Sequence, residues 1–210
     1  MKNKVSIIYK YHVLQIILNK ILYGKHYYNR YKQLINVIPF GASVVDICSG
    51  DCNLFHFVLR GRNKYTGVDI NASRLVKNKN VKQKRLNIID EPLPKADIVV
   101  MQGSLYQFHL LEKKVIDKMM DAAGELVIIS EPIINLANSE NKVISYLAKR
   151  MVNPGTGNIS NRFTKHSIKS FFKENYKNEL EKSFLIAGGR DMVFVLNPNR
   201  QIERNTIQPS

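Results

Sequence analysis

The stretch Val44-Val45-Asp46-Ile47-Cys48-Ser49-Gly50-Asp51-Cys52 joins an apolar run, an acidic residue and a series of small residues. Its β-branched start predicts a buried strand over Ser43–Ile47. The small residues that follow predict a turn in which the backbone can approach a ligand closely. Asp69 closes the next predicted strand, Tyr65–Ile70. A carboxylate about 20 residues after such a turn has the spacing of one that accepts both ribose hydroxyls of a nucleoside.

Predicted strands and helices alternate through the middle of the chain. Further strands are expected at Lys84–Ile89, Asp97–Met101 and Leu126–Ser130, and helices at Leu54–Leu59, Ser73–Lys79 and Leu110–Ala123, the last with Gly124 as its C-terminal stop. Continuous apolar strands that alternate with helices indicate a parallel sheet covered on both faces.

The C-terminal part has a different pattern. Ser183–Ala187 and Met192–Leu196 flank Gly188-Gly189-Arg190-Asp191, which is typical of an antiparallel hairpin. We therefore expect an α/β fold, with a doubly wound, mostly parallel seven-stranded sheet and a C-terminal antiparallel hairpin.

The charge of the chain is strongly positive. Its 210 residues contain 32 Lys and Arg against 17 Asp and Glu, a formal net charge of +15. Residues 1–45 contain seven Lys and Arg and no acid, and residues 60–86 contain nine with Asp69 as the single acid. This favours anionic partners such as nucleic acid, an anionic membrane surface or a phosphorylated substrate. A solubilising surface is an equally weighted alternative.

Cysteine content and hydropathy indicate in which cellular compartment we expect the protein. Two cysteines exclude a disulfide framework and fit a reducing, cytoplasmic location. The stretch Val5–Tyr23 is too interrupted by polar residues to span a membrane, and it lacks the features of a signal peptide. It predicts an amphipathic helix packed on the domain, with peripheral membrane contact through residues 1–32 as the alternative.

Taken together, the motifs resemble those of the class I S-adenosylmethionine-dependent methyltransferases, over residues 40–197. The first motif of that family is matched at Val44, Val45, Asp46 and Gly50, whereas Cys48 and Cys52 stand where many members carry glycine. The later motifs are matched by Gly67-Val68-Asp69-Ile70, by residues 96–105 and by residues 124–132.

The resemblance implies a Rossmann-like domain that binds S-adenosylmethionine. It puts the ribose at Asp69, the methionine part at the Cys48–Asp51 turn, with Asp46 fixing that turn and the amino group, and the adenine at Asn87 or Asp90. The cofactor-binding residues that it implies are Asp46, Cys48, Ser49, Gly50, Asp51, Asp69, Ile70, Asn87, Asp90, Gln102, Gly103 and Ser104.

Catalytic candidates follow the fourth and fifth predicted strands. A general base is needed only where the acceptor atom carries a proton, and His109 is a candidate because histidine is a common general base near neutral pH. Glu131 is a second candidate, and Tyr106 is expected to position the acceptor. The structural alternatives are a histidine at a helix start for His109 and a cap or salt bridge for Glu131.

Other kinds of site fit the same residues less well. A dinucleotide site of the G-x-G-x-x-G type would need glycine in place of Cys48 and Asn53. Cys48, Cys52 and His56 are spaced by four but lack a fourth ligand, so no metal site is expected. In an iron–sulfur pattern, Phe55 stands where the third cysteine is required.

The expected organisation has three parts. Residues 1–40 form an N-terminal helical cap, residues 41–198 the Rossmann-like domain, and residues 199–210 a flexible tail. An insertion over residues 133–163 forms a substrate lid, Thr164 caps the helix after it, and Arg162 is expected to bind a phosphate or carboxylate. Tyr23, Tyr28 and Tyr31 are expected close to the cofactor.

The function that follows is methyl transfer to oxygen or nitrogen of a small-molecule or lipid- or sugar-linked acceptor, with an anionic one among the candidates. One alternative is an RNA methyltransferase that uses the basic stretches as a phosphate track. The Gln102-Gly103-Ser104-Leu105 segment counts against base amino groups, because such family members carry Asn/Asp-Pro-Pro-aromatic there. The other alternative is a degenerate, non-catalytic scaffold, suggested by Cys48 and Cys52.

Overall fold

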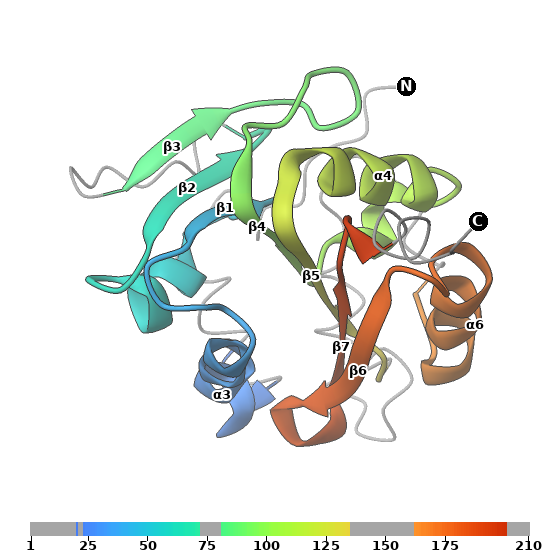
Figure 1. Ribbon diagram of the computed structural model, residues 1–210. Helices are drawn as coiled ribbons and strands as arrows, with labels where there is room; N and C mark the ends of the chain where they lie inside the picture. Colours follow the sequence, from blue (N-terminus) through green and yellow to red (C-terminus); the bar gives the residue numbers. More distant parts are fainter. Residues whose placement is uncertain (1–19, 21–22, 72–80, 135–161, 201–210) are drawn as a thin grey trace, which may run out of the picture.

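A computed structural model describes residue 20 and residues 23–71, 81–134 and 162–200. Its strands form one seven-stranded sheet in the order β3-β2-β1-β4-β5-β7-β6 (Figure 1). The strands are β1 (Ser43–Ile47), β2 (Lys64–Asp69), β3 (Lys82–Arg85), β4 (Ala96–Gln102), β5 (Ala123–Pro132), β6 (Leu180–Ile186) and β7 (Asp191–Leu196). Pairing is parallel from β3 through β5, and β7 is antiparallel to both β5 and β6. The predicted fold class is confirmed.

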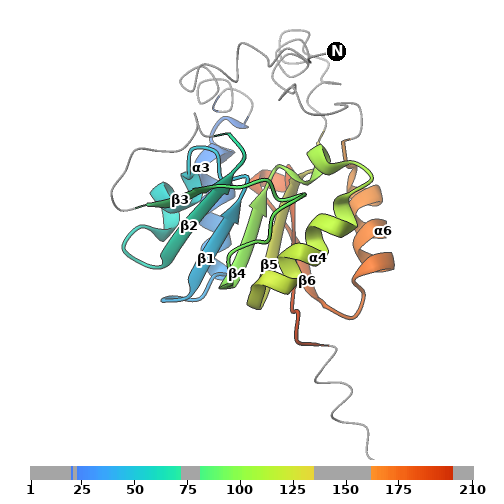
Figure 2. The ribbon, with the colours of Figure 1, turned by 90° about the horizontal axis from the view of Figure 1, so that it is seen from above.

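Helices cover both faces of this sheet (Figure 2). On one face lie α3 (His26–Lys32), the 3-10 helix η1 (Gln33–Asn36) and the π-helical turn η2 (Phe55–Leu59), and on the other lie α4 (Glu112–Ala122) and α6 (Lys165–Asn175). Two short 3-10 helices, η4 (Leu105–Phe108) and η6 (Ala187–Gly189), follow β4 and β6.

The middle parts of the central strands are mostly apolar because both of their faces are buried. Val45 and Val99 pack into the cluster under α4 and α6, whereas Val44 and Val100 pack into the cluster under α3 and η2. Side chains alternate between the faces of a strand, so a strand covered on both sides reads as a continuous apolar run.

Two sequence-based expectations are wrong in detail. The third strand is Lys82–Arg85 rather than Lys84–Ile89, because Leu86 and Ile88 are buried without continuing the ladder. The strand itself lies at the sheet edge, where lysines and arginines are favoured and burial gives no signal. Gly124 is not a helix stop: α4 ends at Ala122, and Gly124 lies inside β5 against the backbone of Ala96.

The predicted hairpin and the predicted helix cap are confirmed, and the predicted helix Leu54–Leu59 is a π-helical turn over Phe55–Leu59. The hairpin forms from β6 and β7. Thr164 caps α6 in a capping box, in which its Oγ1 accepts from the Ser167 backbone N–H at 3.0 Å. The predicted helix Ser73–Lys79, most of the predicted lid and residues 1–19 of the predicted cap lie outside the described residues.

Among the helices of the described residues, none has the length and hydropathy of a membrane span.

Candidate functional site

The parallel register brings the ends of four strands to one edge of the sheet. Ile47 of β1 is paired with Val68 of β2 and with Met101 of β4, and Gln102 of β4 is paired with Ser130 of β5. The residues that follow these positions therefore meet at this carboxyl edge, which is where ligands bind in open α/β sheets. The antiparallel strand β7 begins at the same edge, since Asp191 pairs with Pro132.

The turn after β1 has an alternating left-handed backbone. Cys48 has a φ of 56°, Gly50 of 49° and Cys52 of 53°. Glycine adopts such values freely, whereas other residues are destabilised by about 1–2 kcal/mol. The two cysteines therefore occupy positions whose backbone favours glycine.

This turn packs directly over β2. A Cβ atom on Gly67 would lie 2.8 Å from Ser49 Oγ and 2.9 Å from Cys52 Sγ. Gly67 is therefore required for close approach, which explains a glycine inside a buried strand.

Asp69 ties the turn to the end of β2. Its Oδ2 accepts a hydrogen bond from the Gly50 N–H at 3.0 Å, and its Oδ1 accepts from the Asn71 N–H at 2.9 Å. An ionised carboxylate has about four acceptor sites, so capacity remains for hydroxyl donors. Ile70, the next residue, is 53% exposed.

Asp46 lies beneath the turn and is almost fully buried. Burial raises the pKa of its carboxyl group to about 7, against a hydrogen bond that the Tyr65 hydroxyl donates at 2.7 Å. The negative charge of Asp69 raises the pKa further, which indicates that the two acids lie near each other. Tyr65 was not singled out from the sequence, because its hydroxyl reaches Asp46 only through the β1–β2 pairing.

The two alternative adenine residues lie together after β3. The Leu86 N–H donates to the Asp69 carbonyl at 3.1 Å, which keeps the chain beside β2. The Asn87 side chain then accepts from the Ile89 N–H and donates to the Asp90 carboxylate. Asn87 and Asp90 thus form one hydrogen-bonded unit.

The segment after β4 faces the turn after β1. Gly103 has a φ of 60°, and its N–H donates to the Ser130 carbonyl at 2.7 Å. Ser104 lies within hydrogen-bonding reach of the Cys48 thiol, whose pKa is raised by burial and by nearby Asp69. The buried Nε2 of Gln102 has no hydrogen-bond partner among the described residues.

Glu131 lies at the end of β5 with 1% of its surface exposed. Its Oε2 accepts from the Leu105 N–H at 3.0 Å. Burial raises the pKa of this carboxyl group to about 8, even though hydrogen bonds from the Leu105 and Tyr106 backbones and the charge of Arg162 act in the opposite direction. The guanidinium of Arg162 lies 4.1 Å from the centre of the Tyr106 ring.

His109 has different surroundings. Its side chain is 43% exposed, and its Nδ1 lies 3.4 Å from the Glu112 carboxylate in the first turn of α4. Of the three catalytic candidates, Glu131 and Tyr106 are buried and linked through η4, whereas His109 lies at the surface.

A buried charge cluster at this edge was not expected from the sequence. Arg30 Nε lies 3.0 Å from Asp191 Oδ2, and the Tyr23 hydroxyl donates to Asp191 Oδ1 at 3.0 Å. The guanidinium also lies 4.3 Å from the Tyr23 ring centre, and a Cβ on Gly103 would come within 3.1 Å of Arg30 Nη2. The sequence held one indication that Arg30 is buried. Arg30 falls on the same helical stripe as three other buried residues, Tyr23, Tyr27 and Leu34.

The three tyrosines that were expected close to the cofactor lie in different surroundings. Tyr31 hydrogen-bonds to Asn53 and lies near Asp46, close to the turn. Tyr23 lies at Asp191 instead, and Tyr28 is 40% exposed on the outer side of α3. Tyr27, which was not predicted, accepts from Asn53 Nδ2 at 3.5 Å.

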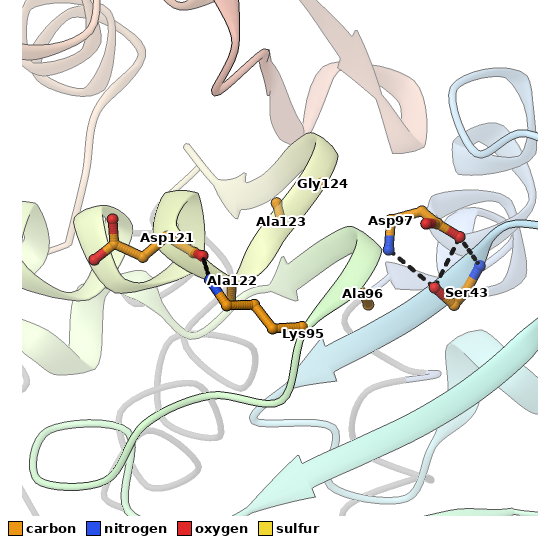
Figure 3. A pocket seen from close by; sticks show the side chains of 8 residues that line it. All are labelled: Ser43, Lys95, Ala96, Asp97, Asp121, Ala122, Ala123 and Gly124. Carbon is orange, nitrogen blue, oxygen red and sulfur yellow. Dashed lines mark hydrogen bonds between the residues drawn. The ribbon is translucent and has the colours of Figure 1, made fainter.

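A hollow of about 400 Å³ lies where the parallel strands begin, at the end of the sheet opposite to the carboxyl edge (Figure 3). It is lined by Ser43, Lys95, Ala96, Asp97, Asp121, Ala122, Ala123 and Gly124. Asp97 Oδ2 accepts from the Ser43 backbone at 2.7 Å, and Lys95 donates to the Asp121 carbonyl. These polar groups satisfy one another at the amino-terminal strand ends, so we do not take this hollow as the functional site. Within the described ranges, no group of three His, Cys, Asp or Glu side chains is arranged to hold a metal ion.

Replacement of Cys48 tests the left-handed turn. Cys48→Gly removes strain of about 1–2 kcal/mol but also removes a small packed side chain, so we expect a change in unfolding free energy below about 1 kcal/mol. Cys48→Val puts a β-branched residue at a φ of 56°, which is strongly disfavoured, so we expect a loss of more than about 2 kcal/mol. Urea unfolding of both variants measures this. Equal losses would show that the residue does not adopt the left-handed backbone.

The chain is similar to known proteins in structure rather than in sequence. No protein-family model and no curated protein sequence matches the chain. An O-methyltransferase family 2 protein from Planctomyces limnophilus, in complex with apigenin, is similar with a TM-score of 0.60 and 12% identity, over 88% of this chain and 60% of that one. Human N-acetylserotonin methyltransferase, in complex with S-adenosylmethionine, has a TM-score of 0.60 and 11% identity, over 90% of this chain and 57% of that one.

A third structure is similar over most of its own length. Magnesium protoporphyrin IX methyltransferase from Synechocystis PCC 6803, with bound S-adenosylhomocysteine, has a TM-score of 0.53 and 13% identity, over 87% of this chain and 82% of that one. The chain spans somewhat more than half the length of the first two proteins. At these identities the likeness concerns the fold, and the strand order and the antiparallel β7 agree with it. The chain therefore has the Rossmann-like fold of the class I methyltransferases.

Proposed function

We propose that the chain is an S-adenosylmethionine-dependent methyltransferase acting on oxygen or nitrogen of a small-molecule or lipid- or sugar-linked acceptor. The observation that carries the proposal is the left-handed turn of Cys48–Cys52, hydrogen-bonded through Gly50 to Asp69. It lies at the carboxyl edge of a sheet whose structural neighbours include proteins crystallised with S-adenosylmethionine or S-adenosylhomocysteine.

The donor and acceptor groups at this edge fit an adenosyl cofactor. Asp69 would accept from the ribose hydroxyls, and the unpartnered Nε2 of Gln102 supplies a buried donor. The Cys48–Asp51 turn would hold the methionine part over Asp46. The Asn87–Asp90 unit would meet the adenine.

The same edge provides groups for an acceptor. When bound, S-adenosylmethionine supplies a methyl group on a positively charged sulfur, and the protein mainly contributes position and exclusion of water. Glu131 orients η4 through the backbone N–H groups of Leu105 and Tyr106. With a pKa of about 8, this carboxyl group is mostly protonated at neutral pH, and its ionised form, whose share grows as pH rises towards 8, would take a proton from an acceptor oxygen or nitrogen. His109 is the second candidate for that role.

Arg162 supports an acceptor that carries negative charge. Its guanidinium lies 4.1 Å from the centre of the Tyr106 ring, which is the distance of a cation–π contact. The guanidinium would pair with a carboxylate or phosphate of the acceptor. We also place the protein in the cytoplasm, because Cys48 and Cys52 are free thiols, a state that a reducing compartment maintains.

Calorimetric titration with S-adenosylmethionine and S-adenosylhomocysteine tests the proposal. We expect saturable binding of both, and transfer of labelled methyl from S-adenosylmethionine to small molecules of a cell extract. Absence of binding by folded protein would contradict the proposal and support a non-catalytic scaffold.

Glu131 has a pH signature that can be measured on the protein alone. Its pKa is raised in the folded state to about 8, so the folded chain holds a proton between about pH 5 and 8 that the unfolded chain has released. Stability therefore falls as pH rises through this range, by up to about 1.4 kcal/mol per pH unit. Glu131→Gln keeps an acceptor for the Leu105 N–H and does not titrate.

Urea unfolding between pH 5.5 and 8 measures the difference between the two proteins. We expect the glutamine variant to gain stability relative to wild type as pH rises, whereas Asp46 titrates in both and cancels. Parallel stability curves would show that Glu131 is ionised throughout.

A further inference from the structure

The fold brings two basic stretches that are distant in the sequence onto one side of the sheet. Residues 25–32 belong to the α3 region and residues 60–64 follow η2, and α3 packs beside η2 (Figures 1 and 2). The contact is aromatic: the ring centres of Tyr28 and Phe57 lie 4.9 Å apart. We call this side the α3–η2 surface, and define it by Lys20, Lys25, Tyr28, Lys32, Phe40, Phe57, Arg60, Arg62 and Lys64.

The charge of this surface is one-sided. Its lysines and Arg60 are exposed and Arg62 is half-buried. In the sequence of residues 20–64, the acids are Asp46 and Asp51, and Asp46 is buried. The opposite face is more balanced, because α4 carries Glu112, Asp117 and Asp121 among its lysines, and Lys113 is paired with Asp117 at 2.7 Å. On the same opposite face α6 adds Lys165, Lys169 and Lys173 with Glu174, so that face also carries cations, but with a larger share of acids than the α3–η2 surface.

Aromatic rings lie among these cations. Lys20 Nζ lies 5.5 Å from the Tyr28 ring centre, and the Arg62 guanidinium lies 5.9 Å from the Phe40 ring centre. Tyr28 is 40% exposed and Phe40 is 78% exposed. Cations that follow a phosphate backbone, interleaved with rings on which bases stack, are the combination used to bind single strands.

We propose that the α3–η2 surface binds single-stranded RNA, independently of the proposed cofactor and of the acceptor. A polyanion is indicated by the cations, and a single strand by the exposed rings. An anionic membrane fits less well, since an interfacial helix needs an apolar outer face. The exposed residues of α3 are instead Tyr28, Asn29 and Lys32, with Lys25 just before the helix, while Tyr27 is turned into the core.

Fluorescence anisotropy with a labelled 12-nucleotide oligouridine tests the proposal, with no cofactor present. If about five cations contact phosphates, affinity should fall about a hundredfold between 50 and 200 mM salt. The variant Lys25→Gln/Lys32→Gln/Arg60→Gln should bind at least tenfold more weakly at low salt and should reduce the logarithmic salt slope by about two. Tyr28→Ser should weaken binding at least fivefold with an unchanged salt slope.

The matched control is Lys165→Gln/Lys169→Gln/Lys173→Gln on α6, which removes the same charge from exposed positions on the other face of the sheet. It should retain affinity within threefold. Equal loss in both triple variants would overturn the proposal, because it would mean attraction by net charge alone. An unchanged affinity in Tyr28→Ser would overturn it as well.

Co-sedimentation with vesicles of phosphatidylserine and phosphatidylcholine tests the alternative partner, an anionic membrane. Vesicle binding that the α3–η2 triple variant abolishes, without RNA binding, would overturn the proposal in favour of a membrane surface. Failure of S-adenosylmethionine to bind would contradict the proposed function and leave this surface unaffected, because the two are measured with different ligands.

Discussion

Arg30→Ala is expected to lower the free energy of unfolding by about 3–5 kcal/mol, because it leaves a buried carboxylate without its cation. The Asp191 side chain is fully buried, and the Arg30 side chain is 9% exposed. With Arg30 removed, Asp191 keeps the hydrogen bond from the Tyr23 hydroxyl but loses the compensating charge. For a chain of this size we expect the melting temperature to fall by about 10 °C, measured by circular dichroism.

A double replacement shows whether the loss of stability comes from the broken Arg30–Asp191 ion pair or from lost packing. Arg30→Met/Asp191→Leu removes both charges and retains apolar volume, so it should be more stable than either Arg30→Ala or Asp191→Ala. Tyr23→Phe should cost about 1.5–3 kcal/mol, as expected for one hydrogen bond to a charged acceptor. A loss below about 1 kcal/mol for Arg30→Ala would show that Asp191 is solvated in solution.

Asp69→Ala is expected to reduce the affinity for S-adenosylhomocysteine by at least about a hundredfold, which corresponds to roughly 3 kcal/mol. Two effects add. The proposed ribose contacts are charge-assisted hydrogen bonds. The same carboxylate also holds the Gly50 N–H, so its removal loosens the turn that receives the methionine part. Calorimetric titration of the wild type and the variant measures the difference.

The control for a change of charge is Asp121→Ala, an exposed acid at the opposite edge of the sheet. It should bind with wild-type affinity. Asp69→Asn should be intermediate, because an amide oxygen can still accept from Gly50 but carries no charge. Affinity within threefold of wild type for a folded Asp69→Ala protein would remove Asp69 from the site.

The strands and the first turn could be predicted because their signals are local. Ile98 to Met101 and Leu126 to Ile129 are apolar without interruption, which is the pattern of a strand buried on both faces, and Asp46 alone interrupts the apolar run from Val44 to Ile47. Gly188 and Gly189, which lie between two β-rich runs, predicted the hairpin. The third strand was misplaced because it lies at a sheet edge, where apolar residues mark burial after the strand rather than the strand itself.

The catalytic candidates could not be ranked in this way. His109 and Glu131 are equally plausible as residues that follow strands, and only the packing shows one exposed beside Glu112 and the other buried beneath η4. A pKa depends on burial and on charges from other segments, which sequence spacing does not contain.

The sequence alone determined the kind of each central element, the order of these elements along the chain and the small-residue turn before Asp69, since hydrophobic period and turn chemistry act over a few residues. The tertiary structure alone decided that Arg30 meets Asp191, that Tyr65 meets Asp46, and that the basic residues of α3 lie beside those after η2. These contacts join residues far apart in the chain, and the free energy of a buried charge depends on the partner that folding places next to it.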